Sequence, residues 1–381
     1  MDPIVVIGTG LAGFNLIKEL RKLDKDTPVV MVTADDGRNY SKPMLSNGFA
    51  KNKGADDLAM AQPEQVAEAL NATVRTGVSV TAIDPAAKTV SLGDEALKYS
   101  KLVLALGADV FRPPLEGDGL DLVYSVNDLM DYAKFREALN GKRDVLILGG
   151  GLIGCEFAND LLSAEFKVEV VEPLGRCLPT LLPEEASRAV QQGLEAAGVR
   201  FHFGPLAKAV HRNGDGVRVE LSDGNSVQAD IVLSAVGLRP RVALAKDAGL
   251  HVNRGIVVDR HLRTSNDDIF ALGDCAEVEG YVLPYILPLM ASSRALAKTL
   301  AGEPTEVSYG VMPVTIKTPA CPTVVCPPPH GTEGAWQCEG EGLDIKALFR
   351  DRTGTLYGYA LTGAACSEKQ SLNKELPALL P

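Results

Sequence analysis

Three glycines at a fixed spacing mark the stretch of this chain that could bind a phosphate. They follow an apolar run of four residues and are Gly149, Gly151 and Gly154. The first glycine allows a tight turn, the second lets the backbone approach a pyrophosphate, and the third lets a helix pack closely on a strand. The helical stretch expected after the turn, Cys155–Leu162, would point its unpaired N–H groups at that pyrophosphate. The spacing predicts a strand, a turn and a helix that bind a dinucleotide.

An acid follows where the ribose of such a dinucleotide would lie. A second β-branched run ends in Glu172, and a carboxylate at this position accepts hydrogen bonds from both ribose hydroxyls. The same carboxylate would repel a 2′-phosphate, so this residue favours NAD over NADP. The simpler alternative for the whole stretch is a glycine-rich turn that binds nothing.

The same arrangement occurs near the N-terminus. An apolar run again precedes three glycines, which are Gly8, Gly10 and Gly13. A helical stretch and a β-branched run follow, and the acid lies at Asp35. Short alternating strands come after each motif and close on apolar runs that end at Gly107 and at Gly237. Because an internal repeat carries more weight than a single motif, we expect two similar dinucleotide-binding domains, one nested in the other.

Whole-chain composition limits the classes of protein that fit. The 381 residues are 46% hydrophobic and 23% charged, which suits two or three domains with full cores. The net charge of −11 argues against general nucleic-acid binding. The first strand starts at Ile4, and the longest apolar run, Tyr281–Ala291, contains two prolines and is too short to span a bilayer. We therefore expect a cytoplasmic protein without membrane insertion.

Two further residues lie where a bound nucleotide could be contacted. Lys42 comes just after the first motif, where contact with a flavin or phosphate competes with a solvated surface position. Asp274 ends the apolar run Ile269–Gly273, and ligands of doubly wound sheets bind at that edge. Its carboxylate could accept hydrogen bonds from sugar-like hydroxyls, cap the segment after it, or do both. A helix over 287–300 would point its N-terminus at the same ligand.

These observations predict an α/β fold with two nested Rossmann-like domains and a small C-terminal α+β cap. The first domain is expected over residues 1–110 and 239–310, the second over 111–238, and the cap over 311–381. In the cap we expect two or three strands and a polar terminal helix, with a weak core of their own.

The order of these motifs resembles that of the flavoprotein reductases with two dinucleotide-binding domains, across nearly the whole chain. Two short motifs, Tyr40–Ser46 and Thr315–Pro319, look most like those of bacterial rubredoxin–NAD reductases, with ferredoxin reductases of oxygenase systems as near neighbours. The resemblance implies an enzyme that contains FAD, takes hydride from NADH and passes single electrons to rubredoxin, a small acidic iron protein. Such an enzyme would supply an electron-transfer chain such as alkane hydroxylation.

The resemblance also assigns binding residues. The FAD pyrophosphate would lie on Gly8, Thr9, Gly10, Leu11, Ala12 and Gly13. The adenosine end would contact Thr33, Ala34, Asp35 and Val80, although many relatives place a glutamate at this strand tip. The ribityl chain would bind Asp274, and the neighbouring FAD contacts would be Gly107, Gly273 and Leu287. The NAD contacts would be Gly149, Gly151, Leu152, Ile153, Gly154, Glu172 and Gly237.

Three charged residues would carry catalysis. Lys42 and Glu156 would form a pair beside the isoalloxazine ring near N5. Lys317 would approach the ring from the cap and stabilise the negative charge that hydride transfer places on it.

The cysteines separate this chain from thiol-dependent relatives. All seven are scattered, none forms a C-x-x-C pair, and none precedes Cys155, which indicates neither a disulfide framework nor a metal site. Electrons would therefore leave the flavin directly. Two alternatives stay open: a flavin NADH oxidase or dehydrogenase that reduces oxygen, a quinone or a dye, and a non-catalytic redox sensor. We expect a monomer or a weak homodimer.

Overall fold

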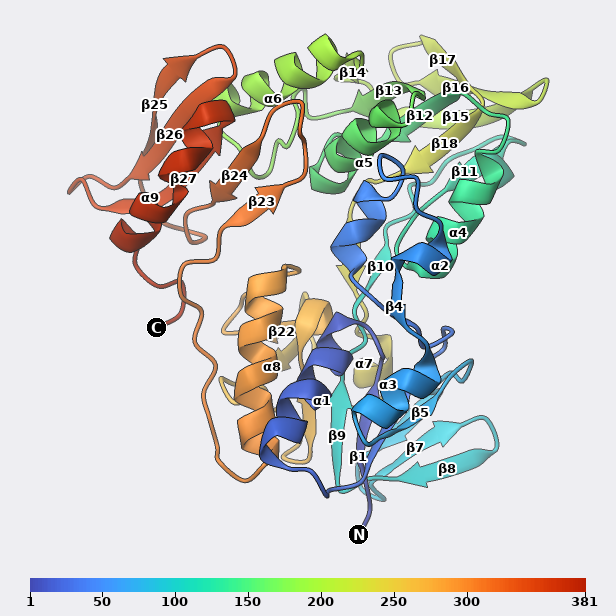
Figure 1. The fold of residues 1–381 in the computed structure, drawn as a ribbon, viewed down its shortest axis with the longest axis vertical. Coiled ribbons are helices and arrows are strands. Elements are labelled where there is room, and N and C mark those ends of the chain that lie inside the picture. The colour runs from blue at the N-terminus through green and yellow to red at the C-terminus, as the bar shows by residue number, and fades with distance from the viewer.

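The structure is a computed structural model that describes residues 1–381. Its first domain, at the bottom of Figure 1, is built on a five-stranded parallel sheet of β-branched, buried segments. In spatial order its strands are β21 (Ile269–Ala271), β9 (Lys101–Leu104), β1 (Ile4–Ile7), β2 (Val29–Val32) and β5 (Thr73–Arg75). The chain therefore returns to this sheet after the second domain has been completed.

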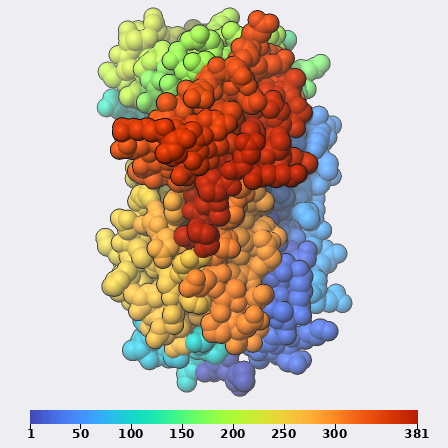
Figure 2. Space-filling view, turned by 90° about the vertical axis from the view of Figure 1, so that its left-hand side faces the viewer, coloured from blue at the N-terminus to red at the C-terminus, as the bar shows by residue number.

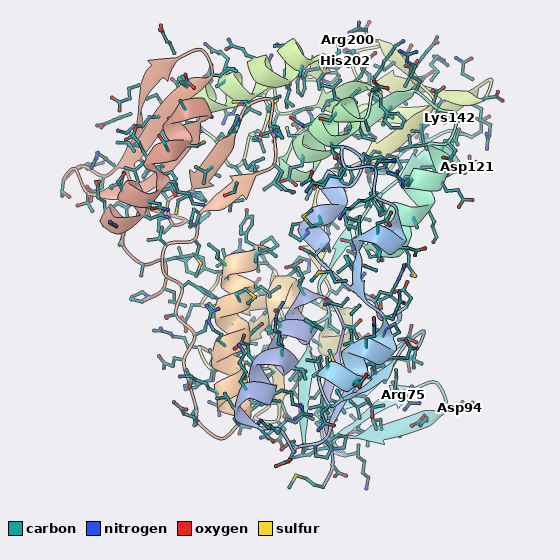
Figure 3. All side chains as sticks on the ribbon, viewed as in Figure 1. Arg75, Asp94, Asp121, Lys142, Arg200 and His202 are labelled. Carbon is teal, nitrogen blue, oxygen red and sulfur yellow. The ribbon has the colours of Figure 1, made fainter.

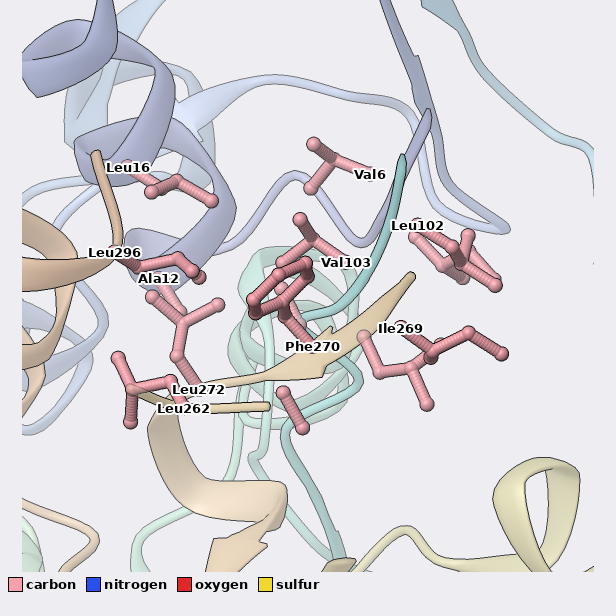
Figure 4. Packing of buried hydrophobic residues seen from close by; sticks show 14 of the residues in the cluster. Val6, Ala12, Leu16, Leu102, Val103, Leu262, Ile269, Phe270, Leu272 and Leu296 are labelled. Atoms are coloured by element: carbon pink, nitrogen blue, oxygen red, sulfur yellow. The ribbon is translucent and has the colours of Figure 1, made fainter. Parts of the chain in front are cut away.

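Two helices cover one face of this sheet. Helix α1 (Leu11–Leu23) and helix α8 (Ile286–Leu300) lie side by side (Figure 1). Figure 4 shows Leu16 of α1 and Leu296 of α8 directed at the strand residues Val103 and Phe270, and all four side chains are buried. The smaller helices of this domain are α2 (Ala55–Leu58), α3 (Pro63–Ala69) and α7 (Ala243–Asp247).

The second domain repeats this plan at the upper right of Figure 1. Its parallel sheet has, in order, β11 (Val123–Tyr124), β18 (Ile231–Ser234), β12 (Asp144–Leu148), β13 (Lys167–Glu172) and β14 (Arg200–Phe203). Its helices are α4 (Leu129–Ala138), α5 (Leu152–Ser163) and α6 (Glu184–Ala197). In each domain the order strand, glycine turn, helix, strand is the one that the sequence predicts.

The internal repeat extends to the smaller strands. A three-stranded antiparallel sheet follows each nucleotide motif: β6 (Ala82–Asp84), β7 (Thr89–Leu92) and β8 (Glu95–Lys98) in the first, and β15 (Ala207–Asn213), β16 (Gly216–Leu221) and β17 (Ser226–Ala229) in the second. The two crossovers between the domains, β10 (Ala108–Val110) and β19 (Leu238–Pro240), pair antiparallel. Charged side chains labelled in Figure 3, such as Arg75 and Arg200, lie on the outer edges of both domains.

The cap, at the upper left of Figure 1, has more strands than we expected. Its antiparallel sheet contains β23 (Val314–Ile316), β24 (Thr323–Cys326), β27 (Leu356–Thr362), β26 (Asp344–Arg350) and β25 (Ala335–Glu341), and α9 (Lys369–Glu375) follows. The run 314–326 splits because Pro319 and Pro322 interrupt it. Strand β25 escaped prediction because nearly all its residues are exposed and it shows no apolar alternation.

The C-terminal tail returns from the cap to the first domain. The N–H of Tyr309 donates to the carbonyl of Leu380 at 2.7 Å, and the N–H of Leu380 donates back at 2.8 Å. Leu379 and Leu380 also pack against the core of the first domain. Figure 2 shows this tail descending from the cap over the lower half of the molecule.

The described elements agree with the predicted fold class of two nested α/β domains and a cap. The residue limits of the domains stay a prediction, although each large sheet falls inside one of them. None of the helices is both long enough and apolar enough to cross a membrane.

Candidate active site

The two glycine turns have the geometry that their spacing predicts. Gly8 and Gly149 have φ angles of 113° and 101°, a backbone conformation that suits glycine. A Cβ on Gly154 would lie 1.9 Å from the carbonyl oxygen of Gly149, and one on Gly13 would lie 2.1 Å from that of Gly8. A side chain at either position would therefore push the helix off its strand.

The middle glycine of each turn instead faces open space. A Cβ on Gly10 or Gly151 would meet no atom within 4 Å. These two residues are also the N-caps of α1 and α5, and no side chain caps either helix or places an acid in its first turn. The first backbone N–H groups of both helices are thus available to an anion. The turns fit the pyrophosphates of two dinucleotides.

A cavity of about 550 Å³ lies against the first turn and reaches the second domain and the cap. Thirteen of the residues predicted to contact FAD line it: Gly8, Thr9, Gly10, Leu11, Ala12, Thr33, Asp35, Lys42, Gly107, Glu156, Asp274, Leu287 and Lys317. Leu152 and Ile153, predicted for NAD, line it from α5. The cavity is lined by the first glycine turn and by the charged side chains of Lys42, Glu156, Asp274 and Lys317, a set of groups that suits FAD.

Four predicted FAD residues do not line this cavity: Gly13, Ala34, Val80 and Gly273. Gly273 supports the wall, because a Cβ on it would lie 2.9 Å from that of Ala12. Val80 is half-buried in the segment after β5, and nearby Val78 donates its N–H to the carbonyl of Thr33 at 2.9 Å. The adenine contact of Val80 stays a prediction.

Asp35 shapes the end of the strand that carries it. Its Oδ1 accepts hydrogen bonds from Thr33 Oγ1 at 2.7 Å, from the N–H of Gly37 at 2.9 Å and from Thr9 Oγ1 at 3.3 Å. These bonds leave Oδ2 without a partner in the protein. One oxygen thus holds the strand tip to the glycine turn, and the other can accept a ribose hydroxyl.

Lys42 and Asp274 face each other across the cavity. Burial lowers the pKa of Lys42, and the charge of Asp274 opposes that shift. Burial likewise raises the pKa of Asp274, and Lys42 opposes it. The ammonium of Lys42 donates to Asn127 Oδ1 at 2.7 Å, while Asn127 Nδ2 donates to the carbonyl of Ala108 at 2.9 Å. Asn127 thereby fixes Lys42 to the crossover between the two domains.

The predicted pair of Lys42 and Glu156 is not formed, and in this respect the prediction is wrong. Glu156 instead pairs with Lys317, whose ammonium bonds to Oε2 and whose backbone N–H donates to Oε1 at 2.9 Å. The hydroxyl of Ser46 also donates to Oε2, at 2.7 Å. Because the two lysines approach the cavity from different elements, local spacing could not decide which of them meets the glutamate.

On the NAD side, Glu172 is buried beneath the second turn. Its Oε2 accepts the N–H of Gly150 and its Oε1 accepts the N–H of Leu174, each at 2.7 Å. Each oxygen can accept one more hydrogen bond, so the carboxylate both shapes the turn and can bind a ribose. Gly237 lies beyond β18 with φ of 117° and is exposed. The NAD roles of these residues stay predictions.

Comparisons with known proteins identify the family. A family model described as pyridine nucleotide-disulphide oxidoreductase matches residues 2–299, and a rubredoxin-binding C-terminal domain model matches 306–376.

This chain belongs to the pyridine nucleotide-disulphide oxidoreductase family.

The chain is 69% identical over 382 residues to a rubredoxin-NAD(+) reductase of Alcanivorax borkumensis, covering all of both chains. It is 44% identical to the enzyme of that name in Acinetobacter baylyi, covering 100% of this chain and 99% of the relative. The crystal structure of a ferredoxin reductase from Rhodopseudomonas palustris superposes with a TM-score of 0.88 at 26% identity, covering 99% and 96% of the two chains. The predicted family is therefore confirmed. The rubredoxin reductases in it use FAD and NADH.

Within this family, the chain lacks a thiol at the cavity. None of the residues that line it is a cysteine, and five of the seven free cysteines are buried elsewhere. Thiol chemistry between the flavin and an acceptor has no group here to carry it. This agrees with the absence of a cysteine before Cys155 in the sequence.

Two residues of the site escaped sequence reasoning. Ser46 belongs to a motif that we noted, but nothing in its spacing points to Glu156, which is 110 positions away. Asn127 directly precedes Asp128, which caps α4 by accepting the N–H of Asp131. That capping signal marks a helix start and gives no sign of a contact with Lys42.

Proposed function

We propose that this chain is an NADH-dependent flavoprotein reductase that passes single electrons to rubredoxin. The observation that carries the acceptor is the match of residues 306–376 to a rubredoxin-binding domain. This domain contributes Lys317 to the wall of the large cavity. An acceptor on the cap would thus lie close to the flavin. The full-length similarity to two rubredoxin-NAD(+) reductases supports the same acceptor.

Different residues would bind FAD and stabilise charge on its ring. FAD, held in the large cavity, would supply the chemistry of accepting a hydride and giving up electrons singly. The turn at Gly8–Ala12 would hold its pyrophosphate, and Asp274 would accept hydrogen bonds from the ribityl hydroxyls. Lys317 would place positive charge beside the ring, where the N-terminus of α8 adds its partial charge. Lys42, fixed by Asn127, offers a second cation at the opposite wall.

We also propose where the protein is located and its oligomeric state. A cytoplasmic location suits the seven free cysteines, because a reducing compartment keeps thiols unpaired. We propose that the protein is a monomer or a weak homodimer. It would supply electrons to an electron-transfer pathway such as that of alkane hydroxylation. The domain limits predicted above belong to the same proposal.

Stopped-flow turnover against purified acceptors tests the function. The protein is reduced anaerobically with NADH and then mixed with rubredoxin, ferredoxin or oxygen. Fast reoxidation by rubredoxin, much slower with the other two, is expected. Preferred reoxidation by ferredoxin would identify a ferredoxin reductase, and preferred reoxidation by oxygen an oxidase. Slow reduction by NADH with a long-lived charge-transfer band would favour the redox sensor.

A further inference from the structure

A second cavity lies behind the charged end of the first. Its volume is about 450 Å³, and it lies between η1 (Lys42–Asn47), α5 and the cap, partly open to solvent. Most of its lining side chains are polar, including the hydroxyls of Ser163, Thr318 and Thr323. A partly open space of this size, with these hydroxyls among its lining residues, can hold several water molecules. Nothing in the proposed binding of FAD or NADH occupies it.

Four residues line both cavities and therefore form the wall between them: Ser46, Thr315, Lys317 and Lys369. Glu156 lines only the larger cavity and bonds to two residues of this wall, Ser46 and Lys317. One turn further along α5, Asp160 lines only the second cavity. The carboxylate of Asp160 accepts the backbone N–H groups of Phe49 and Ala50, at 3.0 and 2.8 Å, which fixes that end of the wall.

The proposed reaction releases a proton inside the protein. NADH and two oxidised one-electron acceptors give NAD⁺, one proton and two reduced acceptors. Since an acceptor such as rubredoxin takes electrons only, the proton must reach solvent by another route. FAD and nicotinamide, if bound in the large cavity as proposed, would fill the space that a proton leaving through that cavity would have to cross.

We propose that this proton leaves through the wall, from the carboxylate of Glu156 to the hydroxyl of Ser46 and then to water in the second cavity. The inference rests on the proposed function for the source of the proton. A carboxylate can accept a proton and return it. A hydroxyl can accept one hydrogen bond while donating another, so once Glu156 is protonated the O–H of Ser46 can turn toward water, give its proton to that water and take the proton of Glu156.

Ser46 allows a specific test because single substitutions can remove its hydroxyl or keep it. Ser46→Ala removes the hydroxyl, Ser46→Thr keeps it, and Ser163→Ala removes a hydroxyl that lines the second cavity and bonds to Asn159 instead of Glu156. Each variant, with FAD bound, is reduced by NADH and mixed with ferricyanide, a one-electron acceptor. A pH-indicator dye in weak buffer follows the proton, and flavin absorbance follows the electrons.

In Ser46→Ala, we expect proton release to slow by at least about tenfold, with a larger solvent isotope effect. Ser46→Thr and Ser163→Ala should release the proton at the wild-type rate. In Ser163→Ala, reduction by NADH, FAD affinity and the flavin midpoint potential should stay unchanged, whereas in Ser46→Ala the loss should fall on proton release more than on reduction by NADH, since hydride transfer moves no free proton. A merely structural role of Ser46 would instead shift the potential or the FAD affinity.

Proton release at the wild-type rate in Ser46→Ala would overturn the proposal. Because ferricyanide replaces rubredoxin, this result is independent of the acceptor. Failure of the wild type to reduce rubredoxin would contradict the proposed function alone, and the dye measurement would still decide the proton route.

Discussion

The two nucleotide units share a turn but differ in the residue that comes two positions after its last glycine. In the first unit this residue is Asn15, whose amide donates to the carbonyl of Leu11 within its own helix, at 2.7 Å. In the second it is Glu156, which bonds to Ser46 of the first domain and Lys317 of the cap. One helix thus satisfies its polar side chain locally, and the other joins three domains.

The same contrast recurs one turn later. Glu19 of α1 forms a surface ion pair with Lys22 on the same helix, and such pairs contribute little. Asp160 of α5 is buried and bonds to the backbone of Phe49 and Ala50. A duplicated unit can therefore keep its turn while the exposed face of its helix becomes an interface. The shared turn binds a dinucleotide, and the side chains beyond it decide what else the unit does.

The largest expected effect is on the glycine turn that both units share. Gly154→Ala places a Cβ on the carbonyl oxygen of Gly149, and we expect a loss of about 3 kcal/mol in the free energy of unfolding. Urea unfolding measures it, with Gly151→Ala as the control, because a Cβ there meets no atom. The control should unfold like the wild type but bind NADH more weakly. Equal stability of Gly154→Ala and wild type would contradict the close packing.

The first unit alone should lose its cofactor when Asp274 is changed. Asp274→Ala removes an acceptor for buried ribityl hydroxyls, which costs on the order of 1–3 kcal/mol, so most of the purified protein should lack FAD. The ratio of flavin to protein absorbance measures this. Glu172→Gln, in the second unit, should keep its FAD. Full occupancy of Asp274→Ala would remove this residue from the site.

The acids of the two units should differ in their effect on nucleotide choice. Glu172→Gln removes the charge that repels a 2′-phosphate, and its single amide oxygen can still accept one of the two N–H groups, of Gly150 or of Leu174, that the carboxylate accepts. The preference for NADH over NADPH should fall by about tenfold, or about 1.4 kcal/mol, in kcat/KM. Asp35→Asn is the matched change in the first unit and should leave the preference intact. A wild type that uses both nucleotides equally would refute the role of Glu172.

The smallest expected effect is on the flavin itself. Lys317→Met removes a positive charge beside the ring and should lower the midpoint potential by about 20 mV, which for two electrons is about 1 kcal/mol. Spectroelectrochemical titration measures it. Lys369→Met is the control, because Lys369 lines the same wall but bonds to Thr315 and not to Glu156. An unchanged potential would mean that Lys317 acts only as a structural partner of Glu156.

Sequence reasoning succeeded where chemistry is local. The glycine spacing predicts a backbone shape, since the conformation and contacts of each glycine involve atoms within a few residues or on the adjoining strand. Asp274 could be placed because a strand end has a known position in a doubly wound sheet. Ion pairing of side chains across domains could not be predicted, because Lys42, Glu156 and Lys317 come from the first domain, the second domain and the cap. Which of these side chains come into contact depends on how the three domains pack, and residue spacing in the sequence does not predict that packing.

The paired ends of the cap have a consequence for its exchange between proteins. Tyr309 and Leu380, on either side of the cap, bond to each other through their backbones. A segment whose entry and exit are adjacent behaves as an insertion, and such segments can be transplanted without redirecting the chain. Residues 310–379 could therefore be exchanged as one module for the cap of a relative, so that acceptor choice changes while both glycine turns stay intact and Lys317 is a residue of the FAD cavity that the new cap must supply again.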